Sequence, residues 1–248
     1  MNRKYWEQIA PSYGEQIFDV LHNDTKGLIR KAIRKHASKR KSAIDIGCAI
    51  GKWLPVLAPQ FGKVVAVDIS AKNLKIAEQL YPNYKNVTYL RADMSGKKTK
   101  VPKCDFGICI NAILTPSAKE RDIFFQSLQA CIKRGGYLVL TVPSLESWLL
   151  SSILQAQFGI DKKLYKEKTP PKEARRKWDQ VRQGNADIDD VPHKHYLEEE
   201  LEILLSRAGF IAEKFQKIEY SWSTEFHHPP KWLRHPRPWD WMVVARRK

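Results

Sequence analysis

The sequence lacks any long hydrophobic run. Spanning a bilayer takes about 18 or more consecutive apolar residues, and the most apolar stretch, 137–154, is interrupted by Pro143 and Glu146. Cysteine is scarce, with four residues and no C-x-x-C spacing, so zinc ribbons and thioredoxin-like sites are not expected. No apolar segment follows the basic N-terminus, so no secretory signal is expected. Reduced, buried thiols predict a cytoplasmic location.

Acidic residues are outnumbered. There are 43 Lys and Arg against 27 Asp and Glu, a net charge of +16, while hydrophobic residues make up 43% of the chain. This composition is typical of a soluble globular protein of one domain, with room for an insertion. The positive charge favours RNA, another polyanion or an anionic lipid surface as a partner, but a protein of high pI with no such partner is equally compatible. The oligomeric state is not indicated.

Short apolar segments alternate with helical ones along most of the chain. Strands are expected at 43–46, 64–68, 87–90, 106–110 and 136–141. Helices are expected from about 51, over 71–80 and over 118–132. Near-continuous apolar strands between helices predict an α/β fold, a parallel sheet covered on both faces. Two later strands, 210–220 and 241–245, have no helix between them and predict an antiparallel hairpin.

Two regions lie outside this alternation. Helices are expected over 3–20 and 24–38, before the first strand. Residues 143–195 contain two helical patches around a basic stretch. An insertion that follows the fifth strand is expected at the mouth of a site on the sheet edge.

The most informative segment is a strand followed by a turn at Gly47 and Gly51. It does not fit a P-loop, because the glycines are too close together and Trp53 stands where a Mg²⁺-binding hydroxyl is needed. It fits a dinucleotide turn poorly, because Ala49 replaces the middle glycine and Asp45 would repel a pyrophosphate.

A cationic cofactor fits the same segment better. S-adenosylmethionine carries a sulfonium and an ammonium, which suit Asp45 at the end of the first strand. Asp68 ends the second strand and can accept both ribose hydroxyls. Asp93 follows the third strand and can accept from the adenine amine, with Met94 packing on the ring. Taken singly, Asp68 and Asp93 are equally explained as a helix cap and a turn cap.

From about Lys41 to Val142 the chain resembles the class I S-adenosylmethionine-dependent methyltransferases. The segment 195–210 resembles their later helix and sixth strand, and the opening segment 5–13 is similar to the N-terminal helix that many small-molecule members fold over the cofactor. The glycine motif departs from the family at Ala49.

The resemblance implies a three-layer αβα sandwich with a seven-stranded, mostly parallel, Rossmann-like sheet whose last strand is antiparallel. It places Asn111 near the methyl-transfer centre. The residues expected to bind the cofactor are Tyr13, Asp45, Gly47, Cys48, Ala49, Gly51, Asp68, Ile69, Asp93, Met94 and Asn111. The expected units are an N-terminal helical lid at 1–40, a core at 41–142 and 196–248, and a substrate cap at 143–195.

These expectations predict transfer of a methyl group to a small molecule by in-line displacement. His195 is the candidate general base, although a single histidine is more often structural. No metal is expected. RNA or protein methylation stays an alternative, because the loop 227–239 interleaves aromatic and basic residues that can stack on bases or simply cover the core. A cofactor-binding protein without catalysis is the third possibility.

Overall fold

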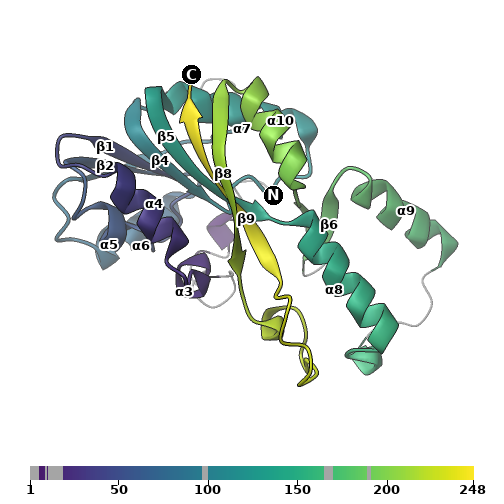
Figure 1. Ribbon diagram of the computed structural model, residues 1–248. Helices are drawn as coiled ribbons and strands as arrows, with labels where there is room; N and C mark the ends of the chain where they lie inside the picture. The colour runs from purple at the N-terminus through teal and green to yellow at the C-terminus, as the bar shows by residue number, and fades with distance from the viewer. Residues whose placement is uncertain (1–5, 9, 11–18, 97–99, 165–169, 189–190) are drawn as a thin grey trace.

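A single seven-stranded sheet forms the centre of the protein in the computed structural model, which describes residues 6–8, 10, 19–96, 100–164, 170–188 and 191–248 (Figure 1). The strand order is β3-β2-β1-β4-β5-β9-β8. The strands are β1 (Ser42–Ile46), β2 (Lys63–Asp68), β3 (Val87–Arg91), β4 (Cys104–Ile110), β5 (Ile132–Pro143), β8 (Phe210–Glu219) and β9 (Trp239–Arg247). β9 runs antiparallel to both of its neighbours, and the other pairs are parallel. The predicted sheet, including its antiparallel last strand, is confirmed.

Helices cover both faces of this sheet (Figure 1). The helices are α3 (Val20–Asn23), α4 (Leu28–His36), α5 (Leu54–Leu57), α6 (Ala71–Leu80), α7 (Ala118–Cys131) and α10 (Glu198–Arg207), with α8 (Leu145–Phe158) and α9 (Pro171–Val181) in the insertion. Most of the helix expected over 3–20 lies outside the described residues, as does Tyr13.

Two hydrophobic cores separate the three layers. Alternate residues of β1 point to opposite faces: Ile44 and Ile46 pack in the cluster that contains α7 and α10, whereas Ala43 packs in the cluster that contains α4, α5 and α6. Burying each of these isoleucines contributes about 1.5–3 kcal/mol. The strands are apolar on both sides because both sides are covered, which is the reason for the near-continuous apolar runs.

Helix α4 begins later than the sequence predicts, at Leu28 and not at 24. The Asp24 carboxylate accepts hydrogen bonds from the backbone N–H groups of Leu28 (2.6 Å) and Ile29 (3.1 Å). Gly27 precedes the helix with a φ of 62°. An acidic side chain that satisfies the first free N–H groups of a helix fixes its start.

The insertion between β5 and α10 contains more structure than predicted. Both expected helices are present as α8 and α9. Beyond them, β6 (Asn185–Ile188) and β7 (Val191–Lys194) form a two-stranded antiparallel hairpin that the sequence did not predict. Strands of four residues are too short to show an alternating pattern.

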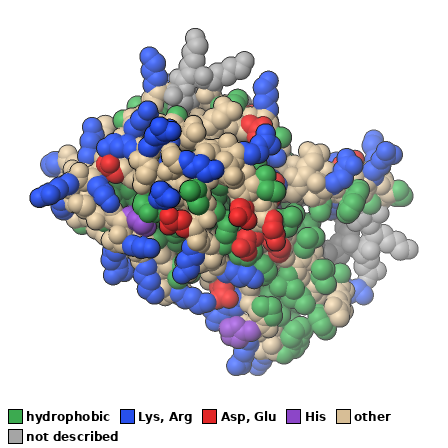
Figure 2. Space-filling view, turned by 45° about the horizontal axis from the view of Figure 1, so that its top comes forward, with side chains coloured by type: hydrophobic (Ala, Val, Ile, Leu, Met, Phe, Trp, Pro, Cys, Tyr) green, Lys and Arg blue, Asp and Glu red, His purple; other side chains and the backbone are tan. Residues whose placement is uncertain are grey.

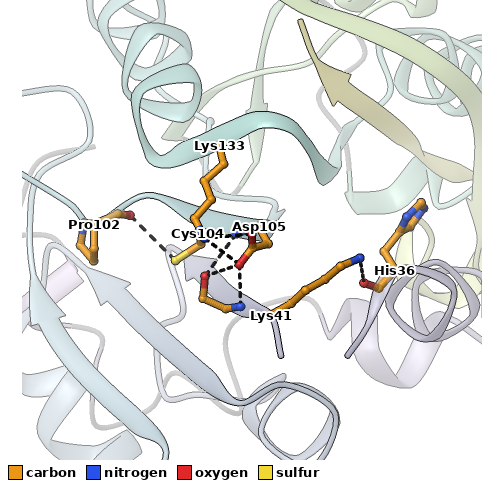
Figure 3. A network of polar contacts seen from close by, with 7 residues as sticks. His36, Lys41, Pro102, Cys104, Asp105 and Lys133 are labelled. Atoms are coloured by element: carbon orange, nitrogen blue, oxygen red, sulfur yellow. Dashed lines mark hydrogen bonds and ion pairs between the residues drawn. The ribbon is translucent and has the colours of Figure 1, made fainter. Parts of the chain in front are cut away.

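A polar network joins the starts of three strands (Figure 3). The Asp105 carboxylate of β4 accepts from the Ser42 backbone N–H (2.8 Å) and hydroxyl (2.7 Å) on β1, and from Lys133 Nζ of β5 (2.9 Å). Partial burial disfavours its charge, but these donors outweigh burial and lower the pKa of Asp105 to about 2. The network thus stabilises the end of the sheet opposite the carboxyl ends of its strands.

Replacing Asp105 by Asn is expected to lower the free energy of unfolding at neutral pH by about 1 kcal/mol, because the site is partly exposed and water weakens the ion pair. The folded pKa lies below the unfolded value of 3.8, so this stability is present above pH 4 or so and is lost as the pH falls toward about 2. Urea unfolding of both proteins across this range measures it. A difference that does not shrink in acid would contradict the assignment.

Candidate functional site

A cavity of about 730 Å³ lies at the carboxyl ends of four adjacent strands. Gly47, Ile69, Ala92 and Asn111, which follow β1, β2, β3 and β4 respectively, all line it. Ligands of open α/β sheets bind at this edge, where the strand order reverses next to the first strand. The volume is within the range of about 300–1,000 Å³ that small-molecule sites occupy.

Backbone geometry at the turn after β1 requires glycine at its first position. Gly47 has a φ of 72°, and a Cβ on it would lie 2.5 Å from the Ala112 Cβ. The N–H groups of Gly47 and Cys48 both donate to the Val67 carbonyl (2.8 and 2.9 Å), which joins the turn to β2. A side chain at Gly47 would therefore clash with the loop after β4 and narrow the cavity.

Ala49, also in this turn, has a φ of 46°, which is uncommon for a residue with a Cβ. Its backbone N–H donates to the Asp68 carboxylate (2.8 Å). The left-handed conformation is therefore held by a buried hydrogen bond, and Ala49 stands where a glycine would adopt the same conformation without strain.

Replacing Ala49 by Gly is expected to raise the free energy of unfolding by up to about 1 kcal/mol. Relief of the left-handed strain, roughly 1–2 kcal/mol, exceeds the larger entropy that glycine gives the unfolded chain, about 0.5–1 kcal/mol. Thermal unfolding measures this change. A lower melting temperature in the variant would contradict the strain at this position.

Asp68 ends β2 and lines the cavity while being almost fully buried. One carboxylate oxygen accepts from the N–H of Ala49 (2.8 Å) and the other from the N–H of Ser70 (2.8 Å). Burial raises the pKa of Asp68, and these backbone hydrogen bonds oppose the rise. The Asn73 side chain also hydrogen-bonds to this carboxylate. The two oxygens have four lone-pair positions in all, so acceptor capacity remains for a ligand hydroxyl.

Asp45 lies in β1 and is 2% exposed. Among the described residues its Oδ2 has no hydrogen-bond partner, although it is fully buried. Burial, and then the nearby charge of Asp68, raise the pKa of Asp45 to about 8. Asp45 is not among the residues that line the cavity, but it lies directly beneath the turn at Gly47 and presents an acceptor that a nearby cation would satisfy.

The third and fourth strands contribute further polar groups. The Asp93 carboxylate accepts from the Ser95 N–H (2.9 Å), and both residues line the cavity together with buried Met94. Asn111 has a φ of 47° and donates through Nδ2 to the Asp240 carboxylate (2.7 Å) on β9. Burial raises the pKa of Asp240 to about 7, and the hydrogen bond from Asn111 opposes the rise.

The structure brings most of the predicted cofactor residues to one cavity. Those that line it are Gly47, Ala49, Asp68, Ile69, Asp93, Met94 and Asn111. Cys48 and Gly51 are close in the chain but do not line it. Burial raises the pKa of the Cys48 thiol well above its usual range, and Gly51, at a φ of 80°, packs on Leu54.

His195 lies apart from this set of residues. It is 4% exposed, its Nδ1 is 3.1 Å from the His193 carbonyl oxygen, and it is not among the residues that line the cavity. Burial lowers its pKa to about 4, so the ring is neutral at physiological pH. Its role as a general base stays a prediction.

The sequence did not point to several residues that line the cavity. Val191 and Pro192 reach it from the insertion, Trp6 from the N-terminal segment, and Thr115 and Glu120 from the loop after β4 and from α7. The Thr115 hydroxyl donates to the Glu120 carboxylate (2.5 Å). Trp6 belongs to the segment 5–13 that resembles the family's N-terminal helix. The other residues belong to no motif, and only the three-dimensional path of the chain brings them together. No group of three potential metal ligands occurs in the described part of the chain.

Comparison with known proteins agrees with this geometry. Residues 43–136 match the family described as "Methyltransferase domain". The chain is 27% identical over 100 residues to phosphoethanolamine N-methyltransferase 1 of Arabidopsis thaliana, covering 40% of this chain and 20% of that protein. It is 28% identical over 125 residues to the malonyl-[acyl-carrier protein] O-methyltransferase of Marinomonas sp., covering 48% of this chain and 44% of that one. The chain thus spans less than half the length of either relative.

Solved structures share the fold over nearly the whole chain. The N-methyltransferase NodS from Bradyrhizobium japonicum, in complex with S-adenosylhomocysteine, has a TM-score of 0.63 at 12% identity and covers 99% of this chain and 97% of its own. A S-adenosylmethionine-dependent methyltransferase from Methanosarcina mazei has a TM-score of 0.61 at 16% identity and covers 87% and 96%. At these identities the similarity shows the fold alone.

Proposed function

The chain belongs, through its residues 43–136, to the class I S-adenosylmethionine-dependent methyltransferases, and we propose that it transfers a methyl group from this cofactor to a small-molecule acceptor. The observation that carries the proposal is the position of Asp68 and Asp93 on one cavity, at the carboxyl ends of adjacent parallel strands, with Asp45 buried near the end of the neighbouring strand β1.

The residues at the cavity fit this cofactor. The buried Oδ2 of Asp45, which has no partner among the described residues, suits its ammonium, and the acceptor capacity that remains on Asp68 suits the ribose hydroxyls. Asp93 and Met94 suit the adenine, one as an acceptor for its amine and the other as an apolar surface. A Cβ on Gly47 would clash with Ala112. Because glycine has no Cβ, the backbone of this turn can approach the cofactor closely.

Bound S-adenosylmethionine supplies an electrophilic methyl group on a sulfonium. The chain then has to orient the acceptor in line with that group and to exclude water. Asn111 is held in place at this part of the cavity by Asp240, and by the Thr141 hydroxyl, which donates to its Oδ1 (3.3 Å). A side chain fixed in this way loses little entropy on binding, which favours a precise position for the reacting groups.

The acceptor is expected beside those cavity residues that are not assigned to the cofactor. The lining there includes the apolar residues Leu114, Pro116, Val191 and Pro192 and the acidic residue Glu120. Mostly apolar walls with a few polar groups are typical of sites for small molecules. The related plant and bacterial proteins are named for acceptors that are a phosphoethanolamine and a malonylated carrier.

Calorimetric titration with S-adenosylhomocysteine, followed by a screen with radiolabelled methyl donor, tests the proposal. We expect 1:1 binding and label transfer into a metabolite extract. Transfer into RNA instead, with binding that weakens steeply as salt rises, would favour the RNA alternative. Binding without transfer to any extract would favour a cofactor-binding protein without catalysis. Failure to bind would contradict the proposed site.

A further inference from the structure

Two segments project from the sheet and contribute no residue to the lining of the cavity. Residues 149–164 comprise most of α8 and the turn after it, and residues 220–238 connect β8 to β9; together they are called the tip. α8 follows the carboxyl end of β5 and the loop follows that of β8 (Figure 1). Since β5 and β8 are both antiparallel to β9, they run in the same direction. The tip therefore leaves the same edge of the sheet as the cavity.

A small hydrophobic core gives the tip a defined shape. Trp222 and Phe226 stack with ring centroids 5.4 Å apart and planes at 6°. Ile160 and Leu233 complete this buried cluster, which joins the loop to the end of α8. The side chains on the outside of the tip are thus held in fixed positions relative to one another.

Hydrogen bonds join the same two segments. The Asp161 carboxylate accepts from the backbone N–H groups of His227 (2.7 Å) and His228 (3.1 Å). Its side chain is 1% exposed, so its charge is directed into the tip. The other acid of the tip, Glu225, is partly buried and hydrogen-bonded to Tyr220.

The outside of the tip is apolar to an unusual degree for a protein surface. Ile153, Phe158, Leu164 and Trp232 are each more than half exposed. Phe158 and Trp232, from different segments, meet edge to face with centroids 4.9 Å apart. Figure 2 shows hydrophobic side chains gathered at the lower right of the molecule, bordered below by basic and histidine side chains. A contiguous apolar patch of this kind marks a docking surface.

Positive charge borders this patch. The exposed cations of the tip are Lys162, Lys231, Arg234 and Arg237. The sequence from 226 to 238 contains no acidic residue. Because its two acids are directed inward, the charged groups that the described tip presents beside its apolar side chains are cations. This combination complements a lipid surface with negative headgroups above an apolar interior.

We propose that the tip docks the protein on an anionic lipid bilayer. Trp232, Phe158 and Ile153 would enter the boundary between headgroups and acyl chains, and the cations would contact lipid phosphates. Single-stranded RNA is the weaker fit, because base stacking needs flat, accessible rings. Ile153 and Leu164 offer none, and Phe158 and Trp232 contact each other. Docking in this way directs the edge of the sheet that bears the cavity toward the membrane.

Flotation with vesicles of phosphatidylglycerol and phosphatidylcholine in equal parts tests the docking surface. The unchanged protein is expected to float with these vesicles. Trp232→Ala should weaken binding about tenfold, since it removes a large apolar side chain from the interface. Lys231→Gln and Arg234→Gln should each weaken it about fivefold. The second variant, Ile153→Asn, changes an apolar side chain on the other segment of the tip and tests the same surface.

Trp178→Ala is the matched control. Trp178 is 65% exposed and follows three basic residues, 175–177, but it lies on α9, outside the tip; this variant should float as the unchanged protein does. All variants should keep the affinity for S-adenosylhomocysteine and the melting temperature. The proposal would be overturned if Trp232→Ala and Trp178→Ala had equal effects, or if the unchanged protein did not float. It would also be overturned if the protein bound RNA through Trp232 and did not float with vesicles. A failure of the methyltransferase proposal would show in the titration alone.

Discussion

Replacing Asp68 by Ala is expected to weaken the binding of S-adenosylhomocysteine by about 10- to 100-fold. This change corresponds to the loss of hydrogen bonds to a charged acceptor, which contribute about 1–3 kcal/mol. The reason is that both oxygens of this carboxylate are held by backbone N–H groups and the residue lines the cavity. The positions left on them are the proposed acceptors for the ribose hydroxyls. Calorimetric titration measures the change.

A ligand comparison separates this contact from a general loss of structure. To the unchanged protein, an analogue that lacks the ribose 2′-hydroxyl should bind less tightly than S-adenosylhomocysteine. To the Asp68→Ala variant, the two ligands should bind with nearly equal affinity. The coupling of the two changes measures the contact itself. Asp105→Asn is the control variant, because Asp105 does not line the cavity; its affinity should not change. Unchanged affinity in Asp68→Ala would refute the ribose assignment.

Replacing Asp45 by Asn is expected to have effects of opposite sign on stability and on binding. The pKa of Asp45 is about 8 in the folded protein, against 3.8 for an exposed group. The carboxyl is thus protonated when folded and ionised when unfolded at neutral pH, so stability decreases as the pH rises from about 4 to about 8. An asparagine does not titrate. The variant should be more stable than the unchanged protein at neutral pH, on the order of 2–4 kcal/mol.

Cofactor binding by the same variant is expected to become weaker. A ligand ammonium beside Asp45 favours the ionised carboxylate, so binding near neutral pH should release about one proton and should strengthen as the pH rises toward 8. Titrations in buffers of different ionisation enthalpy measure the released protons. Asp45→Asn should abolish the release.

Asp240 provides the comparison, because its pKa is raised to about 7 and it contacts the cavity only through Asn111. Asp240→Asn should retain proton release on binding. If release persists in Asp45→Asn and disappears in Asp240→Asn, the ammonium contact is wrongly placed.

Sequence patterns predicted the sheet and its edge well, for a physical reason. Strands covered on both faces are apolar along their whole length, so runs such as 64–68 are unambiguous, and helix α6 was predicted at its observed bounds. Asp68 and Asp93 were found because each ends or follows such a strand. The glycine requirement at Gly47 follows from one turn and is also visible in the sequence.

The acceptor side of the cavity was not predictable in the same way. Asp240 holds Asn111 from a strand more than a hundred residues away in the chain, and Val191 reaches the cavity through a short hairpin. Neither has a local pattern. His195 was singled out as a residue type that does acid–base chemistry, but the fold buries it beside the His193 carbonyl. Contacts of this kind depend on the path of the chain and not on spacing in the sequence.

The position of β9 has a consequence for how the protein is made. β9 lies between β5 and β8 and carries Asp240, although it is the last strand to leave the ribosome. Until it emerges, β5 has an open edge, β8 has no neighbour in the sheet and Asn111 lacks its anchor. The nascent chain must keep that edge from pairing with other chains, and Asn111 gains its hydrogen bond to Asp240 only after translation has passed residue 240.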